Sequence, residues 1–169
     1  MKNPLKSSEA GASRREFLRT AAVAGGAAAL SFRSLPRAHA AGNDEIKIGL
    51  VGCGGRGKGA AANACSSAEN VKLVAVADVF KDRAEAAAQQ LKKFGPVDPG
   101  NVFAGLDAHE KLLALPELNY AILATPPGFR SQHIKAAIKA GKNIFAEKPV
   151  AVDGPTAREC FEAAEEAAQ

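Results

Sequence analysis

The sequence predicts an α/β fold in which helices cover both faces of a parallel sheet. From residue 44 onward, apolar runs of strand length alternate with segments of helical pattern, which is typical of strands joined by crossover helices. The length of 169 residues suits one domain with a tail. The composition is 47% hydrophobic but only 5% aromatic, so we expect a core of aliphatic side chains.

Five strands are predicted, each a short apolar run between turn signals. They are expected at 46–51, 71–77, 102–103, 120–124 and 143–146. The second of these runs, "VKLVAVA", is β-branched, which favours a strand. The fourth, "YAILA", is apolar throughout and is broken by Pro126-Pro127.

Helical segments follow each of the five strands. They are expected at 57–66, at 81–93, after Asp107, at 131–140 and from 153 to 169. Asp107 is a capping residue, and we expect Leu112, Leu113 and Leu115 of its helix to face inward. Gly141 ends the following helix, as glycine commonly does.

A glycine-rich loop lies between the first strand and its helix. The stretch "IGLVGCGGRG" contains Gly52-x-Gly54-x-x-Gly57, with Gly55 and Arg56 between the last two glycines. After a strand and before a helix, the first glycine permits a tight turn, the second lets a pyrophosphate approach the backbone, and the third lets the helix pack close to the sheet. The unpaired N–H groups of the helix terminus would face the phosphates.

An acidic residue completes this pattern. Asp78 ends the second strand, 21 positions after Gly57. A carboxylate there accepts hydrogen bonds from both adenosine ribose hydroxyls and repels a 2′-phosphate, so we expect the cofactor to be NAD rather than NADP. Arg56, Lys81 and Arg83 could soften that preference by attracting phosphate. A Rossmann-type, doubly wound parallel sheet is therefore predicted.

The last helix opens at Asp153 and Pro155 and runs to Gln169, with no strand after it. In a doubly wound nucleotide-binding fold a sixth strand belongs after that helix. We therefore expect the chain to be truncated or a fragment of a longer gene product.

The first 40 residues have the features of an export signal. They contain seven Lys and Arg residues and two acidic residues, whereas the rest of the chain has a net charge of −1. Arg14-Arg15 in "SRREFL" precede an apolar stretch at 21–32 and an A-x-A site at 38–40. This order favours a twin-arginine (Tat) signal peptide at 1–40, a periplasmic or otherwise exported protein, and the Tat translocase as a partner. A general secretory peptide or a disordered Ala-rich tail are the alternatives.

Several classes of function are not indicated. The apolar stretch is too short for a spanning helix, which needs about 20 residues, so we expect no stable membrane anchor. Residues 41–169 contain no basic face with aromatics of the kind that binds nucleic acid. The three cysteines, Cys53, Cys65 and Cys160, lack metal-ligand spacing, so no metal site is predicted, and each is expected to be buried.

The stretch "ATPPGFRSQHIKAAIKAGKNIFAEKPVAVD" resembles the glucose–fructose oxidoreductase / inositol dehydrogenase (Gfo/Idh/MocA) family. The matching motifs are Ala124-Thr125-Pro126, His133, 140–143 and Glu147-Lys148-Pro149, and the resemblance covers about residues 45–169, the family's cofactor-binding half. It implies that the Thr125-Pro126 backbone lines the nicotinamide ribose. It also implies that Glu147 braces the site, and that Lys148 bonds a ribose hydroxyl and the substrate hydroxyl as the catalytic lysine. Periplasmic members of this family are exported by the Tat route.

His133 and His109 carry weaker signals. His133, near the start of a helix, is a candidate for a substrate-side role, or it packs or caps the helix. His109, in "DAHEKLL", has no partner in sequence and is expected on the surface of its helix.

The resemblance implies a sugar, cyclitol or polyol as substrate and hydride transfer as the reaction. Family members carry a second, α+β domain with an open antiparallel sheet that brings an Asp and a His as substrate ligand and general base. That domain is absent from this sequence, so we expect the chain alone to bind NAD but to turn over sugars poorly. The full-length form is expected to be a homo-oligomer. Two alternatives stay open: an NAD-dependent glycosidase, and a non-catalytic nucleotide-binding fragment.

Overall fold

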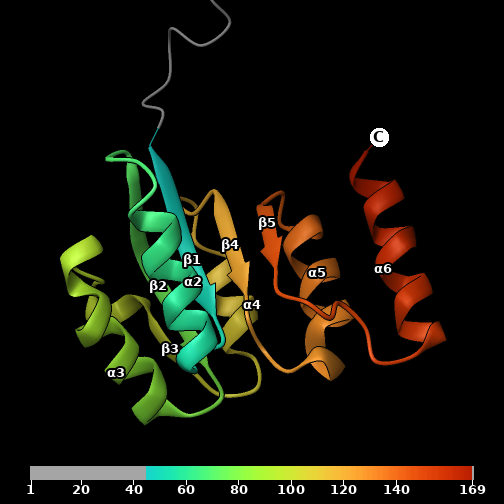
Figure 1. The fold of residues 1–169 in the computed structure, drawn as a ribbon, viewed down its shortest axis with the longest axis horizontal. Coiled ribbons are helices and arrows are strands. Elements are labelled where there is room, and N and C mark those ends of the chain that lie inside the picture. The colour runs from blue at the N-terminus through green and yellow to red at the C-terminus, as the bar shows by residue number, and fades with distance from the viewer. Residues whose placement is uncertain (1–44, 169) are drawn as a thin grey trace, which may run out of the picture. The chain divides into compact units, whose positions relative to one another are not determined.

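The computed structural model describes residues 45–168. Within that range five parallel strands form one sheet in the order β3-β2-β1-β4-β5 (Figure 1). The strands are β1 (Ile46–Val51), β2 (Val71–Asp78), β3 (Val102–Ala104), β4 (Tyr120–Leu123) and β5 (Asn143–Ala146). The chain builds outward from β1 to β3 and then returns to the other side of β1. The predicted doubly wound parallel sheet is thereby confirmed, with its switch point between β1 and β4.

Helices cover both faces of the sheet, as expected. They are α2 (Gly55–Cys65), α3 (Lys81–Leu91), α4 (Ala108–Leu113), α5 (Arg130–Lys139) and α6 (Gly154–Ala167). Buried residues of α2 and α3 pack with Leu50, Leu73 and Val76 on one face. Those of α4 and α5 pack with Val51 and Leu123 on the other face. Alanine predominates among these helix residues, so the helices lie close to the strands.

The helix boundaries differ from the prediction by one or two residues, and two of the differences change where a residue lies. Helix α2 begins at Gly55 rather than Gly57, because Gly54 takes the extended backbone of an N-cap and the next glycines already belong to the first turn. Helix α4 ends at Leu113, so Leu115 lies beyond the helix and is only half-buried. Leu118, which follows it, is the buried residue of that connection.

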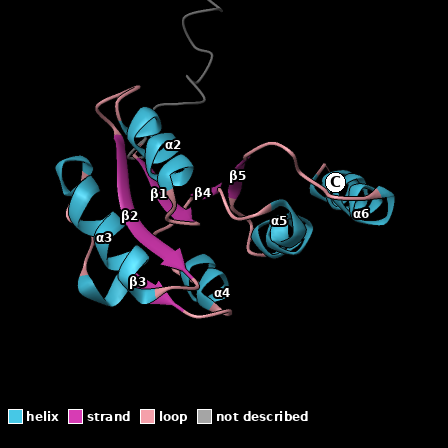
Figure 2. Ribbon diagram, turned by 60° about the horizontal axis from the view of Figure 1, so that its bottom comes forward, coloured by secondary structure: helices cyan, strands magenta, loops and turns pink. Residues whose placement is uncertain are grey.

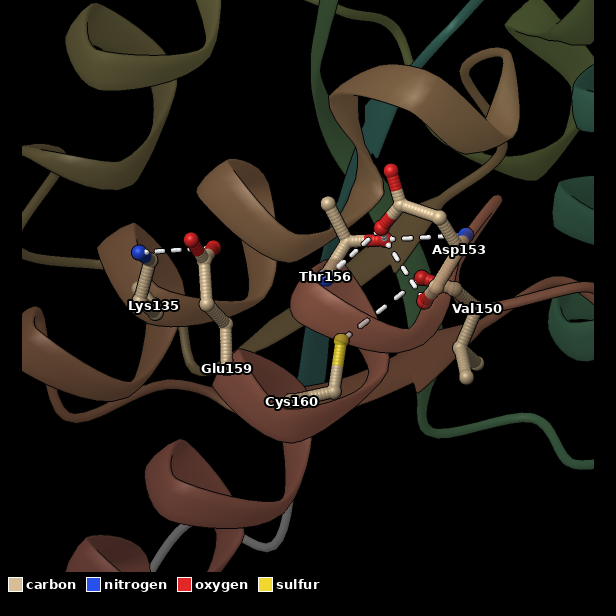
Figure 3. Close-up of polar contacts among 6 residues, drawn as sticks. All are labelled: Lys135, Val150, Asp153, Thr156, Glu159 and Cys160. Atoms are coloured by element: carbon tan, nitrogen blue, oxygen red, sulfur yellow. Dashed lines mark hydrogen bonds and ion pairs between the residues drawn. The ribbon is translucent and has the colours of Figure 1, made fainter.

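Helix α6 begins with a capping box (Figure 3). The Asp153 Oδ1 atom accepts from the Thr156 N–H at 2.8 Å, and the Thr156 Oγ1 atom accepts from the Asp153 N–H at 3.3 Å. The helix packs against α5 (Figure 2), where Lys135 and Glu159 form an ion pair at 2.9 Å. Cys160 of α6 is half-buried, so the expectation that every cysteine is buried holds only for Cys53 and Cys65.

The predicted signal peptide, residues 1–40, lies outside the described residues. Within residues 45–168, no helix combines the length and the hydrophobicity that crossing a membrane requires. The same range contains no cluster of three or more side chains that could hold a metal ion.

Candidate cofactor-binding site

A cleft of about 660 Å³ lies at the carboxyl edge of the sheet. Residues at the carboxyl ends of all five strands line it, among them Gly52, Asp78, Gly105, Thr125 and Glu147. The carboxyl ends of parallel strands at a switch point are where doubly wound folds bind their ligands. The structure therefore brings the predicted site residues together, although they are spread over about a hundred positions of the sequence.

The predicted residues divide into those that line the cleft and those that shape it. Gly52, Gly54, Arg56, Asp78, Thr125, Pro126, His133, Glu147 and Lys148 line the cleft. Gly55 and Gly57 do not line the cleft and lie in the first turn of α2. Gly57 is buried there, whereas Gly55 is exposed.

Two glycines of the loop are in close contact with neighbouring backbone atoms, whereas the third, Gly54, adjoins open space where a ligand would lie. Gly52 has φ of 95°, and a Cβ atom there would lie 2.7 Å from the Ala124 carbonyl carbon. A Cβ atom on Gly57 would lie 1.9 Å from the Gly52 oxygen, so this glycine lets α2 pack onto the turn. A Cβ atom on Gly54 would meet nothing within 4 Å. No side chain caps α2, so its first N–H groups are available to an anion beside Gly54.

The carboxylate of Asp78 joins the glycine loop to the connection after β2. Its Oδ2 atom accepts from the Cys53 N–H at 2.7 Å, and its Oδ1 atom accepts from the Phe80 N–H at 3.0 Å. Each carboxylate oxygen can accept a second hydrogen bond, so the carboxylate can still receive ribose hydroxyls. Burial, with a smaller contribution from the Asp78 charge, raises the pKa of the Cys53 thiol to about 12. This thiol is therefore protonated and unsuited to act as a nucleophile.

The Arg56 guanidinium forms an ion pair with Glu147, the residue that follows β5. The Glu147 side chain is 8% exposed and that of Arg56 is 65% exposed, so a rim arginine covers a buried carboxylate. The hydrogen bond from Arg56 holds the pKa of Glu147 below its usual range. The Glu147 N–H also donates to the Leu123 oxygen at 3.0 Å. Arg56 is thus bound to Glu147 in this structure, whereas the sequence suggested a guanidinium that attracts phosphate.

His133 and Thr125 form one wall of the cleft. The His133 Nδ1 and Thr125 Oγ1 atoms are 2.9 Å apart, and His133 is buried. Burial lowers the pKa of His133 to about 4, with smaller contributions from His109 and Arg130. His133 is therefore neutral near pH 7.

The structure contradicts the prediction that His109 lies on the surface. His109 is 4% exposed, and its ring centroid is 4.2 Å from that of His133. Its Nδ1 atom lies 3.2 Å from the Leu106 oxygen. The reason is the spacing of His109 from Leu112 and Leu113, three and four positions along α4, which places all three on its inner face. That spacing was visible in the sequence and would have identified His109 as buried.

Lys148 is exposed at the cleft, and the residues on either side of it are held. Arg56 binds Glu147, and Arg130 donates from Nη1 to the Pro149 oxygen at 3.5 Å. The Lys148–Pro149 peptide bond is cis. Arg130 was missed in the sequence, where an arginine next to Gly128-Phe129 gave no sign of burial.

The fold and this cleft define the chain as a dinucleotide-binding Rossmann domain. A family model described as "Oxidoreductase family, NAD-binding Rossmann fold" matches residues 46–169. The chain therefore belongs to the Gfo/Idh/MocA oxidoreductase family, and NAD is the cofactor of its domain class.

Similar proteins agree with this assignment. The chain is 32% identical over 157 residues to a glycosyl hydrolase family 109 protein of Solibacter usitatus, which covers 89% of this chain and 35% of that protein. It is 34% identical over 116 residues to an inositol 2-dehydrogenase of Rhizobium meliloti, covering 69% and 32%. The structure of scyllo-inositol dehydrogenase from Lactobacillus casei with NAD(H) and scyllo-inositol matches with a TM-score of 0.63 at 28% identity, covering 73% and 34%. The chain thus spans about a third of the length of these proteins.

Proposed function

We propose that this chain is the cofactor-binding part of an oxidoreductase that transfers hydride between NAD and a carbinol carbon of a sugar, cyclitol or polyol. The observation that carries this proposal is the Asp78 carboxylate at the end of β2, fixed by two backbone N–H groups beside the uncapped start of α2. A carboxylate that can still accept hydroxyl groups suits the adenosine ribose of NAD.

In this proposal the glycine loop binds the pyrophosphate and leaves the nicotinamide half for the other end of the cleft. Thr125 and Pro126 follow β4 there, and Lys148 follows β5. When bound, the cofactor supplies the carbon that accepts hydride. The chain supplies the cradle for the phosphates, the ribose acceptor and a nearby ammonium group.

Lys148 is the residue we assign to the chemistry. Oxidation removes a hydride from the carbinol carbon and a proton from its hydroxyl group, which yields a carbonyl, NADH and one proton. An ammonium group that donates a hydrogen bond to the hydroxyl oxygen stabilises the alkoxide that develops as hydride leaves. Lys148 is exposed at the cleft, where its side chain can reach a substrate.

The proton requires a general base. Low basicity and burial make His133 unsuited to that role, so we assign it to packing and to the hydrogen bond with Thr125. We propose that the base comes from the second domain that the family resemblance implies. The 169-residue chain alone is then expected to bind NAD and to oxidise sugars slowly or not at all.

A second candidate is an NAD-dependent glycosidase, which oxidises a sugar transiently, eliminates the aglycone and reduces the product. The similarity across 89% of this chain to a glycosyl hydrolase family 109 protein favours it. Both candidates use the same cofactor cleft. In the whole protein, release of a chromogenic aglycone without added NAD would support the glycosidase, and net formation of NADH would support the dehydrogenase.

The experiment that tests the proposal is calorimetric titration of the chain with NAD⁺ and with NADP⁺. We expect NAD⁺ to bind more tightly, and Asp78→Ala to weaken NAD⁺ binding by about 10- to 100-fold, because two hydrogen bonds to a charged acceptor are lost. Asp78→Asn is the matched control for the fold, because it keeps an acceptor for the Cys53 N–H. Equal binding of both cofactors, unchanged by Asp78→Ala, would show that the assignment of NAD is wrong.

A further inference from the structure

Arg130 is a buried charge at the edge of the cleft. It is the first residue of α5 and is 2% exposed. Burial lowers the pKa of its guanidinium, and the nearby Glu147 carboxylate opposes that shift. Burying an ion is costly unless its partners compensate for the lost water. An apolar side chain would fill the same space at no such cost, so the contacts of Arg130 must account for its presence.

Those contacts join two loops at the cleft. The Arg130 Nη2 atom donates to the Thr125 oxygen in the turn after β4, and the Nη1 atom donates to the Pro149 oxygen in the loop after β5. Within residues 45–168, Nε of Arg130 has no hydrogen-bond partner. The guanidinium therefore donates its hydrogen bonds to the two loops, and its Nε–H group is left without an acceptor. This arrangement is unusual for a side chain that only fills the core.

The Pro149 contact bears directly on Lys148. Lys148 lies between Glu147 and Pro149, so a fixed Pro149 carbonyl limits where the lysine backbone can lie. Arg56 holds Glu147 from the side of the glycine loop, and Arg130 holds Pro149 from the side of α5. Two arginines from different helices thus fix the two neighbours of one lysine.

We propose that Arg130 is a positioning residue that sets the place of Lys148 at the cleft by joining the turn after β4 to the loop after β5. This inference rests on the proposed function for the role of Lys148, but the position of Lys148 can be measured without a cofactor. Guanidinium geometry matters here, because its N–H groups point to two carbonyls at once, whereas an ammonium is a point charge.

The test follows the acylation of Lys148 by an amine-reactive ester, resolved by mass spectrometry, in the full chain. Lys139, exposed at the end of α5, serves as the internal reference. The variants are Arg130→Gln and Arg130→Lys, and Arg158→Met is the matched control, because Arg158 is an exposed arginine of α6 outside the cleft lining. Without NAD⁺, we expect Arg130→Gln to change the Lys148 rate relative to Lys139 by about fivefold, the factor that loss of one hydrogen bond gives in a local opening equilibrium.

With NAD⁺ the same samples give a second measurement. Bound NAD⁺ is expected to protect Lys148 in the native chain, and Arg130→Gln to weaken NAD⁺ binding by about tenfold and to reduce that protection. Arg130→Lys should be intermediate, and Arg158→Met should match the native chain. Partial rescue by lysine would show that Arg130 acts through its hydrogen bonds to position Lys148, and not only by filling space in the core.

The outcomes distinguish the two proposals. If the native chain fails to bind NAD⁺, the proposed function is wrong. The rate of Lys148 acylation without NAD⁺ still tests whether Arg130 positions Lys148. An unchanged Lys148 rate in folded Arg130→Gln overturns the inference, and so does NAD⁺ binding that leaves Lys148 unprotected in the native chain. If neither Arg130 variant folds, Arg130 is needed by the core as a whole, and the inference is likewise wrong.

Discussion

Arg56 and Glu147 are 91 positions apart in sequence and form an ion pair across the cleft. Arg56 lies in the first turn of α2, after the glycine-rich connection from β1, and Glu147 follows β5. The strand between them in the sheet is β4, so the pair spans the switch point at which doubly wound folds bind their ligands. The pair makes the glycine loop and the loop that contains Lys148 parts of one structure.

This pair predicts a pH-dependent effect of Arg56→Gln. The hydrogen bond from Arg56 holds the pKa of Glu147 below its ordinary value of 4.5. The stability that this ionised group contributes is therefore present above about pH 4.5 and is lost as the pH falls through the folded-state pKa. We expect Arg56→Gln to be less stable than the native chain at pH 7 and similar to it near pH 3. Urea unfolding across this range measures the difference, and a difference that is constant with pH would contradict the prediction.

The glycines of the loop predict two different losses. Gly57→Ala places a Cβ atom 1.9 Å from the Gly52 oxygen, so we expect a loss of about 1–3 kcal/mol in the free energy of unfolding. Gly54→Ala places its Cβ atom in open space at an ordinary backbone conformation, so we expect a cost of at most about 1 kcal/mol. That methyl group would stand where the pyrophosphate is proposed to lie, so NAD⁺ binding should fall at least about tenfold.

Thermal unfolding and calorimetric titration of both variants test this contrast. The two variants are matched, because each adds one methyl group to the same loop. A Gly54→Ala chain that binds NAD⁺ as the native chain does would show that the pyrophosphate lies elsewhere.

The sequence predicted the sheet, and with it the glycine loop and Asp78 at the cleft, because these depend on local patterns. The predicted second strand, 71–77, differs from β2 only in its final residue, Asp78. β-Branched residues favour strands, so a run of them shows where a strand begins and ends. The burial of Arg130 and the partner of His109 could not be predicted from local patterns in this way. The burial of Arg130 depends on Pro149, a carbonyl 19 positions away, and the contact of His109 with His133 joins two different helices. Such contacts exist only once the helices have packed.

The arginine pair in the N-terminal segment predicts the export route. Arg14→Lys with Arg15→Lys keeps the positive charge, which a general secretory signal requires, and removes the pair that a twin-arginine signal requires. We expect the double variant to stay in the cytoplasm while the native chain is exported. Cell fractionation and immunoblotting in a bacterial host measure this. Export of the double variant at the native level would favour a general secretory peptide.

His133 predicts a second pH dependence, at higher pH than that of Glu147. Its pKa is about 4 in the folded chain against 6.5 in the unfolded chain, chiefly because burial disfavours the imidazolium. Between these values the unfolded chain binds more protons, so stability falls as the pH is lowered from 6.5 towards 4. The free energy of unfolding lost between pH 7 and pH 4 through this group is at most about 3 kcal/mol.

Substitution isolates this contribution. His133→Gln removes the titrating group, so we expect its stability to vary less between pH 6.5 and 4 than that of the native chain. Urea unfolding of both proteins gives this difference, and the NMR titration of the ring protons of His133 gives its pKa directly. Thr125→Val is the matched variant, because it removes the hydrogen bond at Nδ1 but keeps the burial that lowers the pKa. If burial is the main cause, His133 should still titrate well below 6.5 in Thr125→Val, and a return to about 6.5 would show that the hydrogen bond was the cause.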